Sequence, residues 1–449
     1  MRGLTSLAVL AVVLLGLGSY IYFFQSKPSP GSGEARPKAV GIPKDEIEQI
    51  VIKSASGEVS TVTKAGGTWQ ITAPLAAPAD ETVMTRIVTL INGIEITRVV
   101  DENPTDLAQY GLAPPQVEVT IKTSGAAGTE RLLLGTKAAI GSAVYAQLSS
   151  SPRVILVDGD VEDAANKGPS DLRDKAVFRI DRDKIDSLEI DSAGGTVQLV
   201  KQGLEWELTK PLHTHGDLGV VSELLTKLTS LQMASIIDSP AAGSATYRLD
   251  KPVFAVTVAA GSSRETLQIG GRADPSNSYA RNLSRPIVFT IPTSVVDALK
   301  NEPAHYRRKD VFEFQTIDAT RLEVVRDGQT TVYEKATAPG SAGKWRKLSP
   351  SAPDIKDIKD IEPAKMDTAL SKLSYLRAVT FVPTPTGLTS VPGVISVLVK
   401  YDEGRKSESV QLAKLGSEPF AVRADWPDAA RLDASAYALL VASLDDLQK

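Results

Sequence analysis

A threefold internal repeat constrains the fold of this chain more than any other feature. The same succession of motifs occurs three times in 449 residues, with a period of about 135 residues. Each copy contains a tryptophan followed five positions later by a proline, and the pairs are Trp69 and Pro74, Trp206 and Pro211, and Trp345 and Pro350. Because about 135 residues can enclose a core of their own, we expect three tandem domains rather than the units of a solenoid.

The local pattern within each copy predicts an α+β domain. Each copy opens with an alternating apolar run, such as Ile47–Ile52, which indicates a strand with one buried face. An amphipathic helix is predicted after each Trp–Pro pair, with these apolar positions: Val83, Ile87, Leu90, Ile91 and Ile94; Val221, Leu224, Leu225, Leu228 and Leu231; Met366, Leu370 and Leu373. Because regular alternation of strands and helices is absent, the sheets are predicted to be mainly antiparallel or mixed.

Helix starts and strand ends also recur. Asp80 and Asp217 are predicted N-caps, and Pro363 suits the first turn of the third helix. Further motifs recur between copies 1 and 2, namely Tyr110-Gly111-Leu112 as Tyr247-Arg248-Leu249, Leu134-Gly135 as Ile269-Gly270, and Arg173, Lys175, Val177 and Phe178 as Arg307, Lys309, Val311 and Phe312. Copy 3 departs from this pattern, since Gly387-Leu388 lacks the tyrosine and the stretch 354–360 adds a predicted solvated loop.

The N-terminal segment predicts a membrane anchor. Leu4–Phe24 is a run of 21 uncharged residues, and as a helix it would extend about 31 Å, the thickness of a bilayer's hydrocarbon core. A cleaved signal peptide is the alternative, but the run is longer than a typical signal core and does not end in Ala-x-Ala. Lys27, Arg36 and Lys38 follow the span and count against an external body. We still expect the body outside the cytoplasm, because long domains translocate largely regardless of charge.

These observations predict five segments. They are an anchor at 1–25, a flexible Pro/Gly/Ser-rich linker at 26–41, and repeat domains at 42–178, 179–312 and 313–449. The three domains are called copy 1, copy 2 and copy 3 below.

Composition narrows the range of functions. The chain has no cysteine, which excludes disulfides, thiolate nucleophiles and cysteine-ligated metals. The net charge of −4 provides no broad cationic field, so nucleic acid is not an expected partner.

The motifs together resemble a known family, the bacterial membrane-anchored proteins with the domain of unknown function 4340. The resemblance rests on the N-terminal anchor, the strand Ile47–Ile52, the Trp69–Pro74 element, Tyr110-Gly111-Leu112 and Leu134-Gly135. It implies a membrane-tethered body and an association with Gld-type ABC transport systems. It supplies no catalytic, cofactor-binding or metal-binding residue.

Chemically active motifs are few. His213 and His215 could chelate a metal if their segment is extended, but the other copies have no counterpart, which favours a solvated loop. The basic run 305–309 is interpreted as a solvated inter-domain junction, with an acidic lipid or partner as the alternative. The stretch 340–344 is not a phosphate loop, because Ala338 replaces its first glycine and Trp345 its final Ser or Thr.

The tryptophans have two interpretations. The repeated residues Trp69, Trp206 and Trp345 could be stacking platforms for sugars, but their recurrence at strands favours core packing. Trp426 has no counterpart in the other copies and is the better candidate for an exposed partner contact.

The sequence therefore predicts a non-enzymatic scaffold or transporter auxiliary, with no catalytic, cofactor-binding or metal site. Its expected location is the bacterial inner membrane, as a single-pass protein whose body lies in the periplasm or otherwise outside the cytoplasm. Expected partners are the lipid bilayer and a membrane protein, such as ABC permease or ATPase subunits. The alternatives are an extracytoplasmic glycan- or peptide-binding protein with grooves between copies, and a hydrolase with an unrecognised site.

Overall fold

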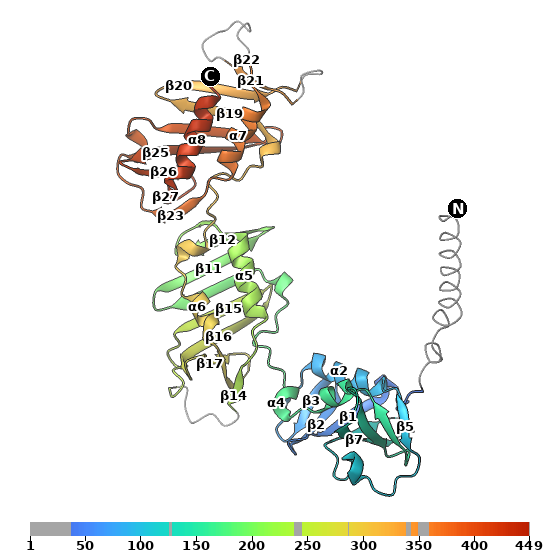
Figure 1. Cartoon of the computed structure of the whole chain (residues 1–449). Helices are drawn as coiled ribbons and strands as arrows, with labels where there is room; N and C mark the ends of the chain where they lie inside the picture. Colours follow the sequence, from blue (N-terminus) through green and yellow to red (C-terminus); the bar gives the residue numbers. More distant parts are fainter. Residues whose placement is uncertain are drawn as a thin grey trace, which may run out of the picture. The chain divides into compact units, whose positions relative to one another are not determined.

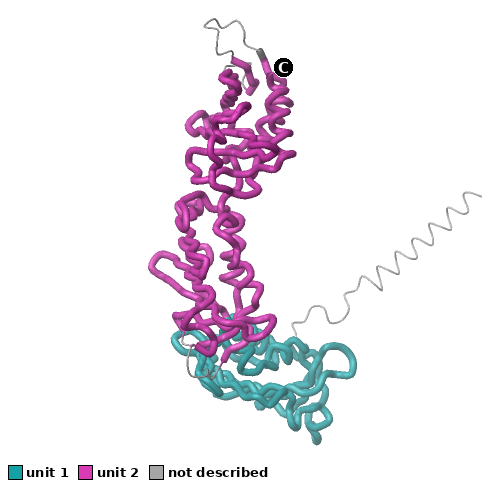
Figure 2. Tube along the Cα trace, turned by 90° about the vertical axis from the view of Figure 1, so that its left-hand side faces the viewer, with its two compact units in different colours: residues 1–175 teal, residues 176–449 magenta. Residues whose placement is uncertain are grey.

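The computed structural model describes residues 37–124, 128–237, 245–285, 287–337, 343–348 and 359–448. The chain divides into two compact units, and the boundary between them falls between Lys175 and Ala176 (Figure 2). The first unit contains copy 1 up to Lys175, and the second contains copies 2 and 3 together with residues 176–178, of which Val177 and Phe178 pack in the core of copy 2. The predicted anchor at 1–25 lies outside the described residues. Among the residues described, no helix is long and apolar enough to cross a membrane.

The first unit is one nine-stranded sheet in the order β4-β3-β2-β1-β6-β7-β8-β9-β5. Figure 1 labels β1, β2, β3, β5 and β7 of this sheet. All of its strand pairs are antiparallel. Its strands are β1 (Ile47–Lys53), β2 (Val59–Ala65), β3 (Thr68–Ala73), β4 (Ala77–Pro78), β5 (Arg98–Asp101), β6 (Val117–Thr123), β7 (Thr129–Lys137), β8 (Val144–Leu148) and β9 (Val154–Val157). Its helices are η2 (Lys44–Glu46), α2 (Glu81–Asn92), η3 (Ala108–Tyr110), α3 (Asp160–Ala165) and α4 (Pro169–Leu172).

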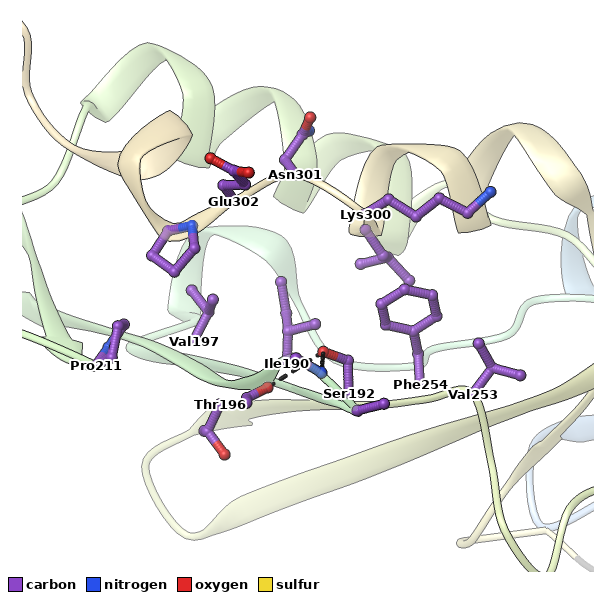
Figure 3. A pocket seen from close by; sticks show the side chains of 15 residues that line it. Ile190, Ser192, Thr196, Val197, Pro211, Val253, Phe254, Lys300, Asn301 and Glu302 are labelled. Carbon is purple, nitrogen blue, oxygen red and sulfur yellow. Dashed lines mark hydrogen bonds between the residues drawn. The ribbon is translucent and has the colours of Figure 1, made fainter. Parts of the chain in front are cut away.

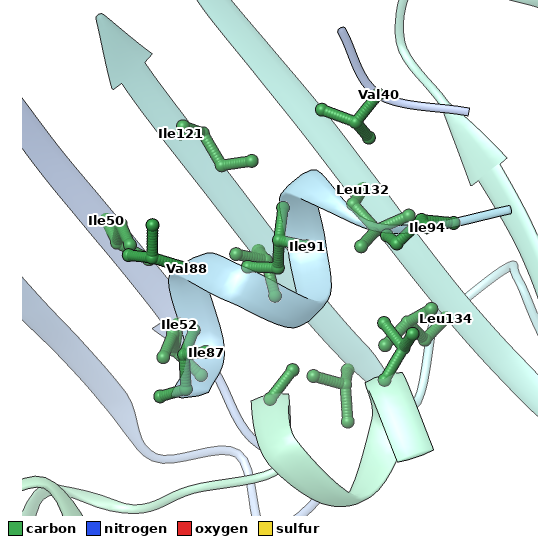
Figure 4. Packing of buried hydrophobic residues seen from close by; sticks show 14 of the residues in the cluster. Val40, Ile50, Ile52, Ile87, Val88, Ile91, Ile94, Ile121, Leu132 and Leu134 are labelled. Carbon is green, nitrogen blue, oxygen red and sulfur yellow. The ribbon is translucent and has the colours of Figure 1, made fainter. Parts of the chain in front are cut away.

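The core of copy 1 lies between α2 and the sheet. Ile87, Val88 and Ile91 face the sheet residues Ile50 and Leu132 (Figure 4). The buried stripe of the helix differs slightly from the predicted one: Met84 and Val88 are buried, whereas Val83 and Leu90 are half-buried. The chain joins this core before position 42. Ala39 donates a hydrogen bond to the carbonyl of Ile94, and Val40 is buried, so these residues of the predicted linker are part of the domain.

The second unit contains two further nine-stranded antiparallel sheets, ordered β13-β12-β11-β10-β15-β16-β17-β18-β14 and β22-β21-β20-β19-β24-β25-β26-β27-β23. Copy 2 has β10 (Ser187–Ser192), β11 (Gly195–Gln202), β12 (Glu205–Lys210), β13 (Thr214–His215), β14 (Ser235–Ile237), β15 (Phe254–Ala260), β16 (Ser263–Arg272), β17 (Asn277–Asn282), β18 (Val288–Pro292), η4 (Arg182–Lys184), α5 (Leu218–Thr229), α6 (Thr293–Leu299) and η5 (Pro303–Tyr306). Copy 3 has η6 (Thr316–Asp318), β19 (Ala319–Arg326), β20 (Gln329–Lys335), β21 (Trp345–Leu348), β22 (Lys359–Asp360), α7 (Pro363–Ser374), β23 (Ala378–Val382), η8 (Leu388–Ser390), β24 (Ile395–Tyr401), β25 (Lys406–Leu415), β26 (Glu418–Arg423), β27 (Ala429–Leu432) and α8 (Ala434–Asp446). The α+β class and the tandem copies are confirmed, and the sheets are antiparallel rather than mixed.

The long helices begin as predicted. Asp80 and Asp217 each accept two backbone hydrogen bonds at the start of α2 and α5, and Pro363 occupies the first turn of α7. Copy 3 has Glu362 at the N-cap, and this residue makes no side-chain cap hydrogen bond. The first turn of α7 is therefore stabilised by proline rather than by a capping carboxylate.

The Tyr-Gly-Leu motif explains a repeated glycine. A Cβ atom at Gly135 would overlap the carbonyl oxygen of Tyr110, and one at Gly270 would overlap that of Tyr247. The tyrosine loop therefore approaches the backbone of β7 and β16 too closely for any side chain. Copy 3 lacks the tyrosine, and the position corresponding to Gly270 by strand register is Ala413, a buried residue. Copy 3 therefore differs from copies 1 and 2 in two linked ways, since it lacks the tyrosine loop and has the methyl group of Ala413 in place of the glycine.

Candidate functional site

The segment Tyr306–Phe312, called the joint segment here, connects copy 2 to copy 3. On the copy 2 side, the backbone N–H of Asp217 donates to the carbonyl of Tyr306 at 2.8 Å, and that of Arg308 donates to the carbonyl of His215 at 2.9 Å. On the copy 3 side, Ala378 donates to Lys309 at 2.7 Å, and Val311 donates to Leu376 at 2.9 Å. The backbone of the joint segment is therefore held by both copies.

Arg307 is a buried charged residue of the joint segment. Its side chain is 2% exposed, and Nη1 lies 2.7 Å from Oδ2 of Asp428 in copy 3. Its guanidinium carbon lies 3.6 Å from the ring centroid of Phe381, also in copy 3. Burial lowers the pKa of Arg307, and Asp428 opposes this shift. A buried guanidinium needs its carboxylate partner, so Arg307 couples the two copies.

Arg423 holds the joint segment from the copy 3 sheet. Its Nη1 donates to the carbonyl of Val311 at 3.0 Å, and Nη2 lies 2.9 Å from Oδ2 of Asp425. The buried Glu408 accepts a hydrogen bond from the backbone N–H of Glu313 at 2.8 Å. Burial opposes the charge of Arg423, but Asp425 and the charges of Glu408 and Glu313 raise its pKa.

Copy 2 uses the same two positions on its own incoming chain. By strand register, Glu265 corresponds to Glu408 and Asn282 to Arg423. Asn282 Nδ2 donates to the carbonyl of Val177 at 2.8 Å, and Glu265 accepts from the backbone N–H of Arg179 at 3.1 Å. A carboxylate and a donor, placed side by side on neighbouring strands, therefore bind the entering backbone in both copies.

Copy 1 has a different pair at these positions. The counterpart of Arg423 is Leu148, which is buried, and the counterpart of Glu408 is Glu130. Glu130 accepts from Ser149 Oγ at 2.7 Å and from the backbone N–H of Ser150 at 3.1 Å, so it binds its own hairpin. Copy 1 therefore lacks the side-chain donor that copies 2 and 3 direct at the entering backbone.

A polar cavity of about 600 Å³ lies where copies 2 and 3 meet. Its charged lining includes Arg308 and Glu313, whose Nη1 and Oε2 atoms are 2.9 Å apart, and Arg377, whose Nε lies 3.0 Å from Asp310 Oδ1. Arg377 also lies 3.4 Å from Asp217, the N-cap of α5. Most of the charged groups that line the cavity already pair with one another.

A second hollow, called the copy 2 groove here, lies within copy 2 and has a volume of about 450 Å³. Ile190, Val197 and Phe254 rise from the sheet toward the segment that carries Lys300 and Glu302 (Figure 3). The turn Ala193–Gly194 between β10 and β11 forms one wall. Pockets of this size and mainly apolar lining are typical of small-ligand or side-chain binding sites.

The two histidines that could have shared a metal each lie beside a different glutamate. His213 Nε2 lies 3.3 Å from Glu207, and His215 Nδ1 lies 3.7 Å from Glu205. Within the described ranges, no group of three or more His, Asp and Glu residues could hold a metal ion.

The basic run 305–309 is at an inter-domain junction, as predicted, but the junction is not simply solvated. Arg307 is buried, and the side chain of Arg308 is only 18% exposed. Sequence reasoning did not find Asp428 and Arg423, because they lie more than a hundred residues from the joint segment and belong to no repeated motif. The recurrence of Arg173 as Arg307 was the available signal for this site.

The tryptophans fall into two groups. Trp69, Trp206 and Trp345 are at most 5% exposed and lie in the three cores, so they pack there as expected. Trp426, the candidate for an exposed contact, is instead half-buried and packs edge-on against Phe381 with ring centroids 5.4 Å apart. It therefore lies beside the joint.

Comparison with known families identifies the fold family. The family model for the domain of unknown function DUF4340 matches residues 69–205 and 206–391. The chain belongs to this family. Each matched segment of the DUF4340 protein begins at a repeated tryptophan, within β3 or β12, and continues into the following copy. The sequence unit of the family is thus offset from the structural domain, whose first strands precede the tryptophan.

Comparisons with curated proteins and with solved structures do not identify a function for the chain. No curated protein matches the chain significantly. Among solved structures, a putative DNA polymerase III beta subunit from Eubacterium rectale shares 10% identity, with 89% of this chain and 93% of that chain covered and a TM-score of 0.16. A DNA polymerase sliding clamp from Pseudomonas aeruginosa shares 9% identity, with 87% and 92% covered and a TM-score of 0.14. These TM-scores are too low to support an argument about fold or function.

Proposed function

We propose that this protein is a non-enzymatic, membrane-anchored scaffold or auxiliary subunit at the bacterial cell envelope. In this proposal residues 1–25 anchor it in the inner membrane as a single-pass protein, and the three copies lie outside the cytoplasm. Its partner is a membrane complex, such as the permease or ATPase subunits of a Gld-type ABC transport system.

One observation carries the scaffold proposal: the joint between copies 2 and 3 is built from buried charged groups. Arg307 pairs with Asp428, and Arg423 and Glu408 bind the backbone on both sides of Phe312. Partly desolvated ion pairs of this kind favour one geometry and strongly disfavour arrangements that leave a charge unpaired. Two domains fixed in this way present a constant surface, which suits a role in positioning partners.

Affinity purification in mild detergent tests this proposal. The full-length tagged chain is compared with a chain lacking residues 1–24 and with the joint variant Asp428→Ala, all expressed in the native host. Co-purification of ABC permease or ATPase subunits with the full-length chain is expected, with loss in the deletion and weakening in D428A. Recovery of no membrane subunit above background with the full-length chain would contradict the scaffold role.

The second candidate function is an extracytoplasmic glycan- or peptide-binding protein. The polar cavity of about 600 Å³ between copies 2 and 3 favours it, because charged and hydroxyl groups there could bind a polar ligand. Thermal unfolding with panels of oligosaccharides and peptides separates the two candidates. A saturable rise in Tm that Arg308→Ala abolishes supports a ligand at the junction, and a Tm unaffected by every panel member argues against it.

A further inference from the structure

The elements that correspond to the walls of the copy 2 groove are joined by a direct contact in each of the other two copies. In copy 1, the side-chain oxygen of Asn166 accepts a hydrogen bond from the backbone N–H of Ala55 at 2.9 Å, which ties the β1–β2 turn to the end of α3. In copy 3, Arg326 at the end of β19 pairs with Asp445 of α8 at 2.5 Å. The sheet end and the terminal helix are therefore bridged in both.

Copy 2 has neither bridge. By strand register Ala193 corresponds to Ala55 and Ser192 to Arg326. The turn in copy 2 is also one residue shorter than that in copy 1, because Ser192 pairs with Gly195 across two residues. Lys300 occupies the place of Asn166 in the repeat, and its ammonium pairs with Asp297 on its own helix at 2.6 Å. The groove consequently stays open.

Three features of the open groove define the chemistry of a ligand. Its floor is apolar, with Ile190, Val197 and Phe254 as the main residues. The backbone N–H of Ala193 has no acceptor among the described residues, whereas that of its counterpart Ala55 donates to Asn166. Ala193 itself is exposed and lines the groove. At the mouth, Asp297 neutralises Lys300, whereas the carboxylate of Glu302 forms no ion pair with the described part of the chain.

We propose that the copy 2 groove binds an extended peptide segment of a partner protein, presenting an apolar side chain beside a basic residue. The apolar side chain fills the floor, a peptide carbonyl accepts from the N–H of Ala193, and the basic residue pairs with Glu302. The uncompensated carboxylate disfavours a ligand with an anionic head, such as a fatty acid, and a peptide supplies all three groups within two residues. This inference goes beyond the scaffold role, which depends on the joint and on the anchor rather than on this groove.

Calorimetric titration of the full chain in lipid nanodiscs tests the groove. The probes are two capped tetrapeptides, acetyl-Gly-Phe-Lys-Gly-amide and its counterpart with Glu in place of Lys. The key variant is Ser192→Arg, which copies Arg326 of copy 3 and places a guanidinium in the lining of the groove. Leu204→Arg is the matched control, because it adds the same charge at a turn residue that is 88% exposed and does not line the groove.

We expect the Phe-Lys peptide to bind wild type and L204R equally and S192R at least about tenfold more weakly. A second variant, Glu302→Gln, should keep binding of the Phe-Lys peptide but reduce its preference over the Phe-Glu peptide by about two- to fivefold, as for an exposed ion pair. Unchanged melting temperatures show that the variants fold. Equal binding to wild type and S192R, or no binding to wild type, would overturn the proposal. Neither result bears on co-purification with membrane subunits, so failure here is distinct from failure of the scaffold role.

Discussion

Copies 1 and 3 have the same nine-stranded sheet but differ at one position that faces the incoming chain. Copy 1 has the buried Leu148 there, and copy 3 has Arg423, which donates to the carbonyl of Val311. Copy 2, which also follows another copy, has Asn282 and donates to Val177. Copies 2 and 3 thus bind the entering backbone through one polar side chain at a position where copy 1 has a leucine.

The strongest test of this comparison transfers the residue of copy 1 into copy 3. Arg423→Leu removes the donor to Val311 and leaves Glu408, which is 7% exposed, beside Glu313 without its cation. We expect the free energy of unfolding to fall by about 3–5 kcal/mol, the usual cost of breaking a buried ion pair. Urea unfolding of the full chain measures the change.

The control is Arg431→Leu, which removes an exposed pair with Glu418 at 3.4 Å. It should cost at most about 1 kcal/mol. If R423L cost no more than R431L, the role of Arg423 in receiving the joint segment would be refuted.

Copies 2 and 3 also differ at the tyrosine loop, where we expect a smaller change in stability. Gly270→Ala should destabilise copy 2 by about 1–3 kcal/mol, because the methyl group overlaps the carbonyl of Tyr247. In copy 3, where Ala413 is native and the tyrosine is absent, Ala413→Gly should cost only about 0.5–1 kcal/mol. Denaturant titration of both variants provides the comparison, and a larger loss for A413G than for G270A would contradict the coupling of loop and glycine.

The smallest effect concerns the helix starts. Asp217→Ala removes an N-cap that accepts from Gly219 and Val220, together with the pair with Arg377 at 3.4 Å, and should cost about 1 kcal/mol. Glu362→Ala removes an N-cap side chain without a cap hydrogen bond, and should change stability by less than about 0.5 kcal/mol. Circular dichroism during thermal unfolding gives both values. Equal losses for the two variants would show that the cap contact of Asp217 adds no stability.

The local structure and the repeat could be predicted from the sequence. Alternating runs such as Ile47–Ile52 identify strands, and the spacing of Val221, Leu224 and Leu228 identifies a buried helix face, because these signals are local. The antiparallel order of nine strands could not be predicted, since β5, β14 and β23 join the far edge of each sheet through long-range pairing.

The candidate site was only partly visible in the sequence. The repeat of Arg173 as Arg307 marked the joint, but its partner Asp428 lies 121 residues further along the chain. The copy 2 groove is open because copy 2 lacks a contact that copy 1 has. Lys300 stands where copy 1 has Asn166, and the turn between β10 and β11 is one residue shorter than that between β1 and β2. Such a difference becomes meaningful only when strand register places the three copies on one another.

Copies 2 and 3 lie in one compact unit, and we expect Arg307 and Asp428 to hold them in one fixed arrangement. Because the chain has no cysteine, spin labels can be attached at Leu204→Cys in copy 2 and Leu415→Cys in copy 3, both exposed positions, without other substitutions. Pulsed electron spin resonance then gives the distribution of distances between the labels. We expect a single narrow distribution for the otherwise wild-type chain, and a broadened one when Asp428→Ala is added. A broad distribution with Asp428 intact would contradict the claim.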